Sequence, residues 1–300
     1  MNGLVSVRKS LYAVVMCTLA SVTSAMEFGR LGGTFTMHGE IEPGDSIAFV
    51  KDLISWDYPP TIFHIESPGG DLAEAMQIGR IIRDSHVPVW TGEECSSACV
   101  FIYVSGVERL ARGRVGLHRP YFGPQYFSGL TSAQAKKKYA DLRRAVEGFL
   151  KEMEVSNVIK QRIFETGSNE MDFISESESN RIFGEISPFY DEWLAAKCGR
   201  LSPHEQKVID SWANLVAARS VLTIAADDTI PKSEAFGSNF SELMEASLLA
   251  FRMEQAGTLQ PFKDTSKRHS ECRESAAEKH IYSFHRALKK YMSGEDSDLQ

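Results

Sequence analysis

Apolar and polar positions alternate along the first half of the chain in a way that predicts strands and helices in turn. Short apolar runs, typical of buried strands, occur at 33–38, 61–65, 87–90 and 107–115. Between them, apolar residues recur every three or four positions, as on one face of a helix, at 46–56, 72–85 and 96–103. Strands that alternate with helices predict an α/β fold with a mostly parallel sheet built from repeated ββα and βαβ units.

The second half of the chain is dominated by helical patterns. Helices are expected at 131–153, 155–165 and 178–183, with one last short strand at 173–174. Beyond Cys198 only helical spacing is found, beginning at the capping box Ser202-Pro203-His204-Glu205 and continuing at 240–256 and 266–291. We therefore predict an α/β domain over 30–197, a small all-α region over 198–292 and a polar, disordered tail over 293–300.

The N-terminal segment has the pattern of a secretory signal. Arg8 and Lys9 precede an uncharged apolar run from Leu11 to Val22, and Thr23-Ser24-Ala25 offers small residues for cleavage. The run is shorter than the ~20 residues that a membrane-spanning helix needs. We predict that 1–25 is a signal peptide and that the protein is periplasmic or secreted. The alternative is an uncleaved segment that anchors the protein to the membrane.

The net charge of the chain argues against two classes of binding partner, and its cysteine count indicates disulfides. The chain carries a formal charge of −7, and an acidic surface argues against nucleic acid and against an anionic membrane face. Four cysteines follow the predicted signal, and an even number in an exported chain suggests disulfides. We expect Cys198 to pair with Cys272. Cys95 and Cys99 are interpreted as two small buried side chains in preference to a strained bridge. No metal site is expected, because no Cys-x-x-Cys or neighbouring histidine pair accompanies them.

Three loops that follow predicted strands carry the candidate chemistry. They are Ser67-Pro68-Gly69-Gly70, Cys95-Ser96-Ser97-Ala98-Cys99 and Gly116-Leu117-His118-Arg119-Pro120. In an open parallel sheet, ligands bind at the carboxyl ends of the strands, so these loops are expected to meet around one crevice. A segment rich in Gly, Phe, Tyr and Pro, 121–130, is expected to form a mobile loop over it.

Each of these residues has an ordinary structural explanation when taken alone. Ser97 at a helix start fits a capping residue, the Gly69-Gly70 pair fits a tight turn, and His118 fits a structural histidine. The alternative interpretation is that these residues act together in a reaction. A hydroxyl at a helix start, a histidine base and glycine N–H groups that a carbonyl can approach are the parts of an acyl-transfer site.

As a set, the motifs resemble the proteolytic subunit of the Clp protease and the wider ClpP/crotonase fold over roughly residues 34–190. The quoted likeness lies in 37–41, 65–70, 95–106, 116–120 and 172–175. The resemblance implies that Ser97 is the nucleophile and His118 the base. It also implies an oxyanion hole made by backbone N–H groups of Gly69, with Gly70 beside it, and of Ala98.

The resemblance leaves the third catalytic member open. The family's aspartate falls on Met171 in this chain, whereas Asp172 stands one residue further on. Asp172 is the candidate if the strand is shifted or bulged by one residue. Glu170 is the alternative acid. Without either acid, the site is a dyad or a backbone carbonyl orients the base.

The expected function is that of an exported serine peptidase acting on short or already unfolded peptides. No cofactor is expected, and no ATPase partner either, because an exported protein has no ATP supply. A homo-oligomer is compatible with the resemblance. The alternatives are a binding or assembly module that keeps the fold without turnover, and a crotonase-type acyl-thioester enzyme.

Overall fold

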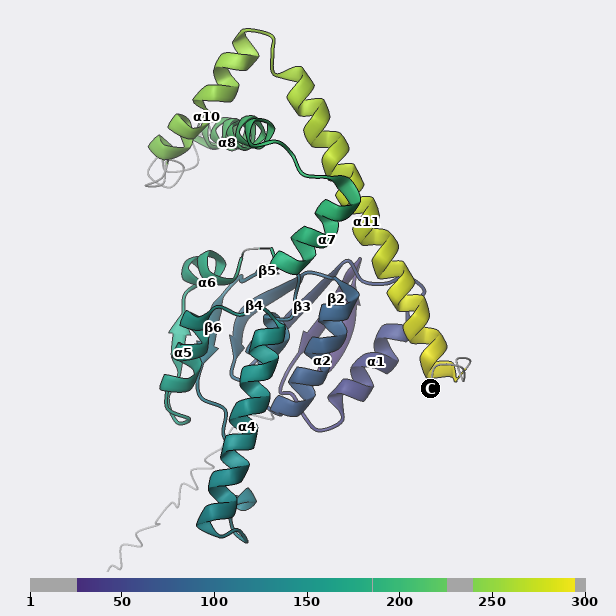
Figure 1. Ribbon diagram of the computed structural model, residues 1–300, viewed down its shortest axis with the longest axis vertical. Helices are drawn as coiled ribbons and strands as arrows, with labels where there is room; N and C mark the ends of the chain where they lie inside the picture. Colours follow the sequence, from purple (N-terminus) through teal and green to yellow (C-terminus); the bar gives the residue numbers. More distant parts are fainter. Residues whose placement is uncertain (1–25, 185, 226–239, 295–300) are drawn as a thin grey trace, which may run out of the picture.

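The computed structural model describes residues 26–184, 186–225 and 240–294 (Figure 1). The predicted signal peptide and residues 295–300 of the predicted tail lie outside the described residues. Within those described, no helix combines the length and the apolar character that crossing a membrane requires.

Seven strands of the described part of the chain form a mixed sheet at the centre of the α/β region. Its order is β1-β2-β3-β4-β6-β7, with β5 also paired to β4. The pairings between β2 and β6 are parallel, whereas β1 and β7 add antiparallel strands at the two edges. The predicted α/β class is confirmed. The strands are β1 Glu27–Leu31, β2 Thr34–His38, β3 Ile62–Ser67, β4 Val89–Ser96, β5 Arg109–Leu110, β6 Arg114–Leu117 and β7 Asp172–Ile174.

Helices cover one face of this sheet. Phe63 and Ile65 of β3 are fully buried while their neighbours are half exposed, as the twofold period of a strand requires when one face meets a core. Figure 1 shows α1, α2 and α4 side by side over that face. The helices of the α/β region are α1 Asp45–Ser55, α2 Leu72–Ser85, α3 Cys99–Tyr103, α4 Ser132–Glu152, α5 Asn157–Glu165 and α6 Glu176–Phe183.

The largest departure from the sequence prediction lies around Ser97. The expected helix over 96–103 is only the five-residue α3, and the strand expected at 87–90 runs on to Ser96. Pairing explains the longer strand, because Cys95 lies opposite Ser67 of β3 and Ser96 lies opposite Gly116 of β6. Ser97 therefore occupies a turn before the helix rather than its first turn.

Other differences concern segments with weak apolar patterns. β1 was missed because it is an exposed edge strand without an apolar run. The helix α7, Pro188–Cys198, was also missed, although Pro188 at its first position and Gly199 at its end are helix signals. The remaining helices are α8 Pro203–Ala225, α10 Phe240–Gln255 and α11 Gln260–Ser293, which begins six residues earlier than expected.

We call α8, α10 and α11 the helical arm. In Figure 1 the C-terminal part of α11 runs alongside the α/β region, and α8 and α10 lie near its N-terminal part, away from the sheet. The expected disulfide between Cys198 of α7 and Cys272 of α11 is present. His280 of α11 stacks on the buried His86 with ring centroids 3.8 Å apart, and His285 hydrogen-bonds the Leu53 carbonyl. The arm therefore contacts the end of the sheet at which the parallel strands begin.

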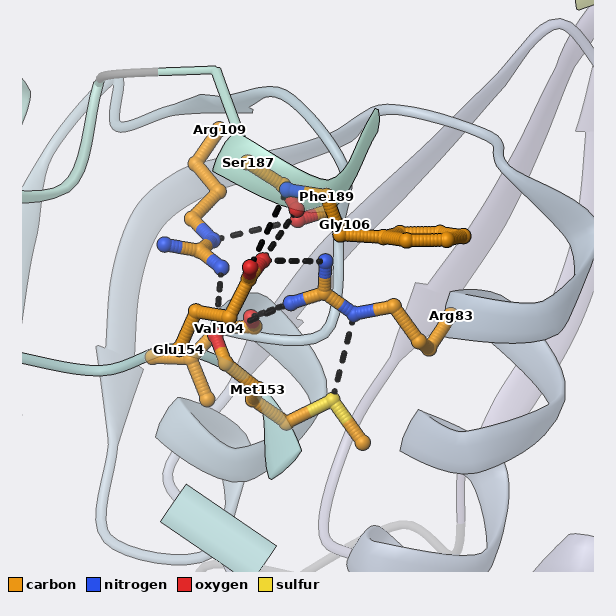
Figure 2. Close-up of polar contacts among 8 residues, drawn as sticks. All are labelled: Arg83, Val104, Gly106, Arg109, Met153, Glu154, Ser187 and Phe189. Carbon is orange, nitrogen blue, oxygen red and sulfur yellow. Dashed lines mark hydrogen bonds and ion pairs between the residues drawn. The ribbon is translucent and has the colours of Figure 1, made fainter. Parts of the chain in front are cut away.

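A buried arginine cluster joins α2, α4 and α7 at that same end (Figure 2). Arg83 and Arg109 both donate to the carbonyl of Met153, at 2.9 and 2.8 Å. Burial lowers the pKa of Arg109 to about 10, so its guanidinium stays charged at neutral pH. The Glu154 carboxylate lies 3.5 Å from Arg83 and accepts the backbone N–H of Phe189 at 3.1 Å. One carboxylate thus compensates a buried charge and holds the first turn of α7.

Replacing Glu154 should destabilise the fold. Glu154→Ala leaves Arg83 without its counter-charge and frees the Ser187 hydroxyl and the Phe189 N–H. We expect a loss of about 2 kcal/mol in the free energy of unfolding, measured by urea denaturation. The matched control is Glu152→Ala, which removes the exposed ion pair with Arg80 and only a through-space charge interaction with Arg83, and which should cost less than ~1 kcal/mol. Equal losses in the two variants would contradict the cluster's role.

Candidate functional site

Ser97 sits in a left-handed turn between β4 and α3. Its φ is 56°, a conformation that costs a residue with a side chain ~1–2 kcal/mol. The Ser97 N–H donates to the Gly116 carbonyl at 2.9 Å, which ties the turn to β6. Gly69 lies directly against it: a Cβ on Gly69 would stand 2.6 Å from the Ser97 Cβ. The glycine after β3 is therefore required by close approach as well as by its own φ of +110°.

The turn presents the Ser97 hydroxyl to His118, which follows β6. Ser97 Oγ and His118 Nε2 are 2.6 Å apart, and both residues are half-buried. Burial lowers the pKa of His118, against a smaller opposing effect of the Arg119 backbone, so the ring is neutral at pH 7. A neutral ring that accepts the Ser97 proton at Nε2 carries its own proton on Nδ1. That Nδ1 is buried and has no hydrogen-bond partner of good geometry among the described residues, although the Arg119 backbone lies near enough to the ring to favour its charged form.

The three backbone N–H groups predicted as oxyanion donors differ in whether they already have an acceptor. The Gly69 N–H donates to the Ser67 hydroxyl at 3.1 Å and is therefore occupied. The N–H groups of Gly70 and Ala98 donate to no acceptor in the described part of the chain. Of the three expected oxyanion donors, Gly70 and Ala98 remain available. Ser67 was not singled out from the sequence, although a serine two residues before a glycine is typical of this turn.

The serine and the histidine open onto a cleft of about 670 Å³. Gly69, Gly70 and Ala98 line it, together with Tyr121 and Gly123 from the segment expected to lie over the site. Glu40 and Glu170 are the charged side chains of its lining. The described residues contain no group of three His, Cys, Asp or Glu side chains placed to hold a metal ion.

The structure does not bring Asp172 to His118. Both carboxylate oxygens of Asp172 are held by Arg162 of α5, at 2.7 and 2.8 Å, and this pairing lowers the pKa of the carboxyl. The alternative acid, Glu170, accepts only the Gly167 N–H, at 3.4 Å. Neither acid hydrogen-bonds His118 in this structure.

Strand register explains the position of Asp172. β7 pairs with β6 without a bulge, and Asp172 lies opposite Leu117, whose side chain is in the core. Successive side chains of a strand point to opposite faces, so His118 and Asp172 belong to different faces. Continued by one residue, the register sets Met171 opposite His118. Met171 also lines the cleft.

The two cysteines that bracket Ser97 form a disulfide. Their interpretation as separate buried thiols was wrong. Cys95 belongs to β4 rather than to a helix, and the turn at Ser97 brings its Cα to 5.3 Å from that of Cys99, within the range for a disulfide.

No model of a known protein family matches this chain, and no curated protein matches its sequence. The geometry around Ser97 therefore carries the functional argument.

The protonation of His118 should follow its burial. Because burial lowers its pKa, we expect the ring to titrate below its ordinary value of 6.5. Reactivity that needs the neutral ring then rises with pH through that lower midpoint, and more than half of the rise lies below pH 6.5. Ring NMR shifts of His118 measure the midpoint without reference to activity. A midpoint at or above 6.5 would contradict the assignment.

Placing an acid on the His118 face should reverse this shift. In Met171→Asp, a carboxylate facing the ring favours the charged imidazolium and should raise the His118 midpoint by about one pH unit. The matched control, Asp172→Asn, removes a carboxylate on the other face and should leave the midpoint unchanged. The same NMR titration reads both variants. A shift in Asp172→Asn equal to that in Met171→Asp would show that the register argument fails.

Proposed function

We propose that this protein is an exported serine hydrolase of ClpP/crotonase-like fold that cleaves peptide bonds by acyl transfer. The observation that carries the proposal is the 2.6 Å contact between Ser97 Oγ and His118 Nε2, at the mouth of a cleft and beside the unpaired N–H groups of Gly70 and Ala98. The alternation of parallel strands and helices, with all three loops at the carboxyl ends of strands, supports the fold assignment.

The proposed reaction uses only groups of this chain and water. His118 Nε2 takes the hydroxyl proton as Ser97 Oγ attacks the peptide carbonyl, and the N–H groups of Gly70 and Ala98 stabilise the oxyanion. His118 then gives the proton to the leaving amine. Water, deprotonated by the same nitrogen, hydrolyses the acyl-serine and restores Ser97.

The site proposed is a serine–histidine dyad. No carboxylate holds Nδ1 to fix the His118 tautomer and stabilise the imidazolium, and the Arg119 backbone only partly offsets the effect of burial. In a triad, loss of the carboxylate lowers turnover by about 10⁴. Slow turnover is therefore expected. The same observation favours the second candidate, a binding or assembly module that keeps the fold without turnover, because Asp172 is committed to Arg162.

Location and partners follow from the rest of the chain. Two disulfides favour an oxidising compartment such as the periplasm or the exterior, in agreement with the proposed signal peptide. Substrates there are short or already unfolded peptides, with no ATPase partner. Assembly into a homo-oligomer remains part of the proposal.

A fluorophosphonate probe tests the proposal directly. Wild-type protein should be labelled on Ser97, and Ser97→Ala should lose the label with little change in melting temperature. Among the described residues, the Ser97 hydroxyl makes no hydrogen bond other than that to His118. The control is Ser96→Ala, the adjacent serine whose hydroxyl bonds Glu94 instead. It should keep the label.

Two results would decide against hydrolysis. Folded wild-type protein that takes up no label would favour the binding module. A label that persists in Ser97→Ala would remove that serine from the nucleophile role.

A further inference from the structure

We propose that the Cys95–Cys99 disulfide positions the nucleophile by closing the Ser97 turn, and that its loss slows acylation of Ser97 more than it destabilises the fold. The inference rests on the proposed function, since it concerns the reactivity of the same serine. Cys95 and Cys99 act through Ser97 and are positioning residues.

The two halves of the turn are held unequally by the backbone. On the strand side, Cys95 is paired with Ser67 of β3 and with Val115 of β6, so it is fixed from both neighbours. On the helix side, α3 is five residues long and its first residue, Cys99, follows Ala98, which provides no side-chain cap. So short and uncapped a helix is held by the burial of its five residues and by its own first turn, in which the Val100 N–H donates to the Ser97 carbonyl, and not by pairing with a neighbouring strand.

The disulfide joins the fixed half to the other half. It links the strand residue Cys95 to the first residue of α3 and encloses Ser96, Ser97 and Ala98. Within this loop lie both the reactive hydroxyl and the free Ala98 N–H. Ser97 is held at a φ of 56°, which a residue with a side chain leaves readily when it is not constrained. Closing the loop therefore fixes the attacking oxygen and one oxyanion donor together.

The burial of both sulfurs protects the Cys95–Cys99 bond, which we call the brace, from reduction in the folded protein. Both cysteine side chains are fully buried. Opening the bond takes two electrons and two protons from a dithiol, which leaves as its own disulfide and yields the thiols of Cys95 and Cys99. Because both sulfurs are buried, a dithiol reaches them only when the turn opens transiently, so the folded protein is reduced slowly.

The second disulfide provides a matched control. Cys198–Cys272 spans 74 residues and Cys95–Cys99 spans four. In the chain-entropy account, a bond that closes a longer loop stabilises more. The two bonds should therefore have opposite rankings: Cys198–Cys272 matters more for stability, and Cys95–Cys99 matters more for reactivity.

The experiment compares Cys95→Ala/Cys99→Ala with Cys198→Ala/Cys272→Ala and wild type. For each we measure the second-order rate of fluorophosphonate labelling at Ser97, its pH midpoint and the melting temperature. In Cys95→Ala/Cys99→Ala the labelling rate should fall by about tenfold or more, since misplacing a reactive group by about 1 Å is that costly. Its pH midpoint should stay that of wild type, because His118 is untouched. Cys198→Ala/Cys272→Ala should keep the rate and lose more melting temperature.

The outcomes separate the two proposals. Labelling of Cys95→Ala/Cys99→Ala within twofold of wild type overturns the brace and leaves the proposed function standing. Absence of label in the wild type overturns the proposed function and the inference with it.

Should the double variant not fold, wild-type protein is partially reduced with dithiothreitol, trapped with iodoacetamide and mapped by mass spectrometry. Labelling that falls in step with reduction of Cys95–Cys99 supports the brace. Labelling that is independent of it overturns the brace.

Discussion

The candidate site depends on one constraint, the left-handed turn at Ser97 wedged between two neighbouring strands. The turn exists because β4 is paired up to Ser96, and the chain must then reverse direction within two residues to enter α3. Gly69 leaves room for it on one side, and the Gly116 carbonyl receives its N–H on the other. The three loops that carry the chemistry are thus packed against one another through backbone.

This packing also explains why the acid is missing from the site. The position that faces His118 is set by the pairing of β7 with β6, and a strand cannot move an aspartate by one residue without turning every side chain to the other face. A slip that brought Asp172 to His118 would expose Ile174, which is fully buried. It would also break the two bonds from Arg162. The buried Ile174 and the ion pair between Asp172 and Arg162 of α5 therefore hold β7 in a register that keeps Asp172 away from His118.

The sequence predicts the elements whose burial follows a regular period, but not the features that depend on how strands pair. The apolar runs at 61–65 and 72–85 predicted β3 and α2 because burial alternates there with the period of each element. The meeting of Ser97 and His118 was predicted because each follows the carboxyl end of a predicted parallel strand and because the motifs resemble those of a known family. The register of β7 was not, since Glu170, Met171 and Asp172 lie one step apart and only pairing with β6 selects among them. The buried cluster of Arg83 and Glu154 gave no signal, because charged residues in sequence indicate an exposed face.

The helical arm and the candidate site occupy opposite ends of the sheet. Ser97 and His118 follow the carboxyl ends of β4 and β6, whereas His280 and His285 of α11 meet the segments that precede β3 and β4. The Cys198–Cys272 disulfide closes the arm onto α7, and Glu154 holds the first turn of α7 on the α/β region. The two disulfides therefore lie at opposite ends of the parallel strands. Because no described contact of the arm reaches the Ser97 turn, the chemistry of the cleft is set by the α/β region. The arm adds a surface that can be altered without moving Ser97.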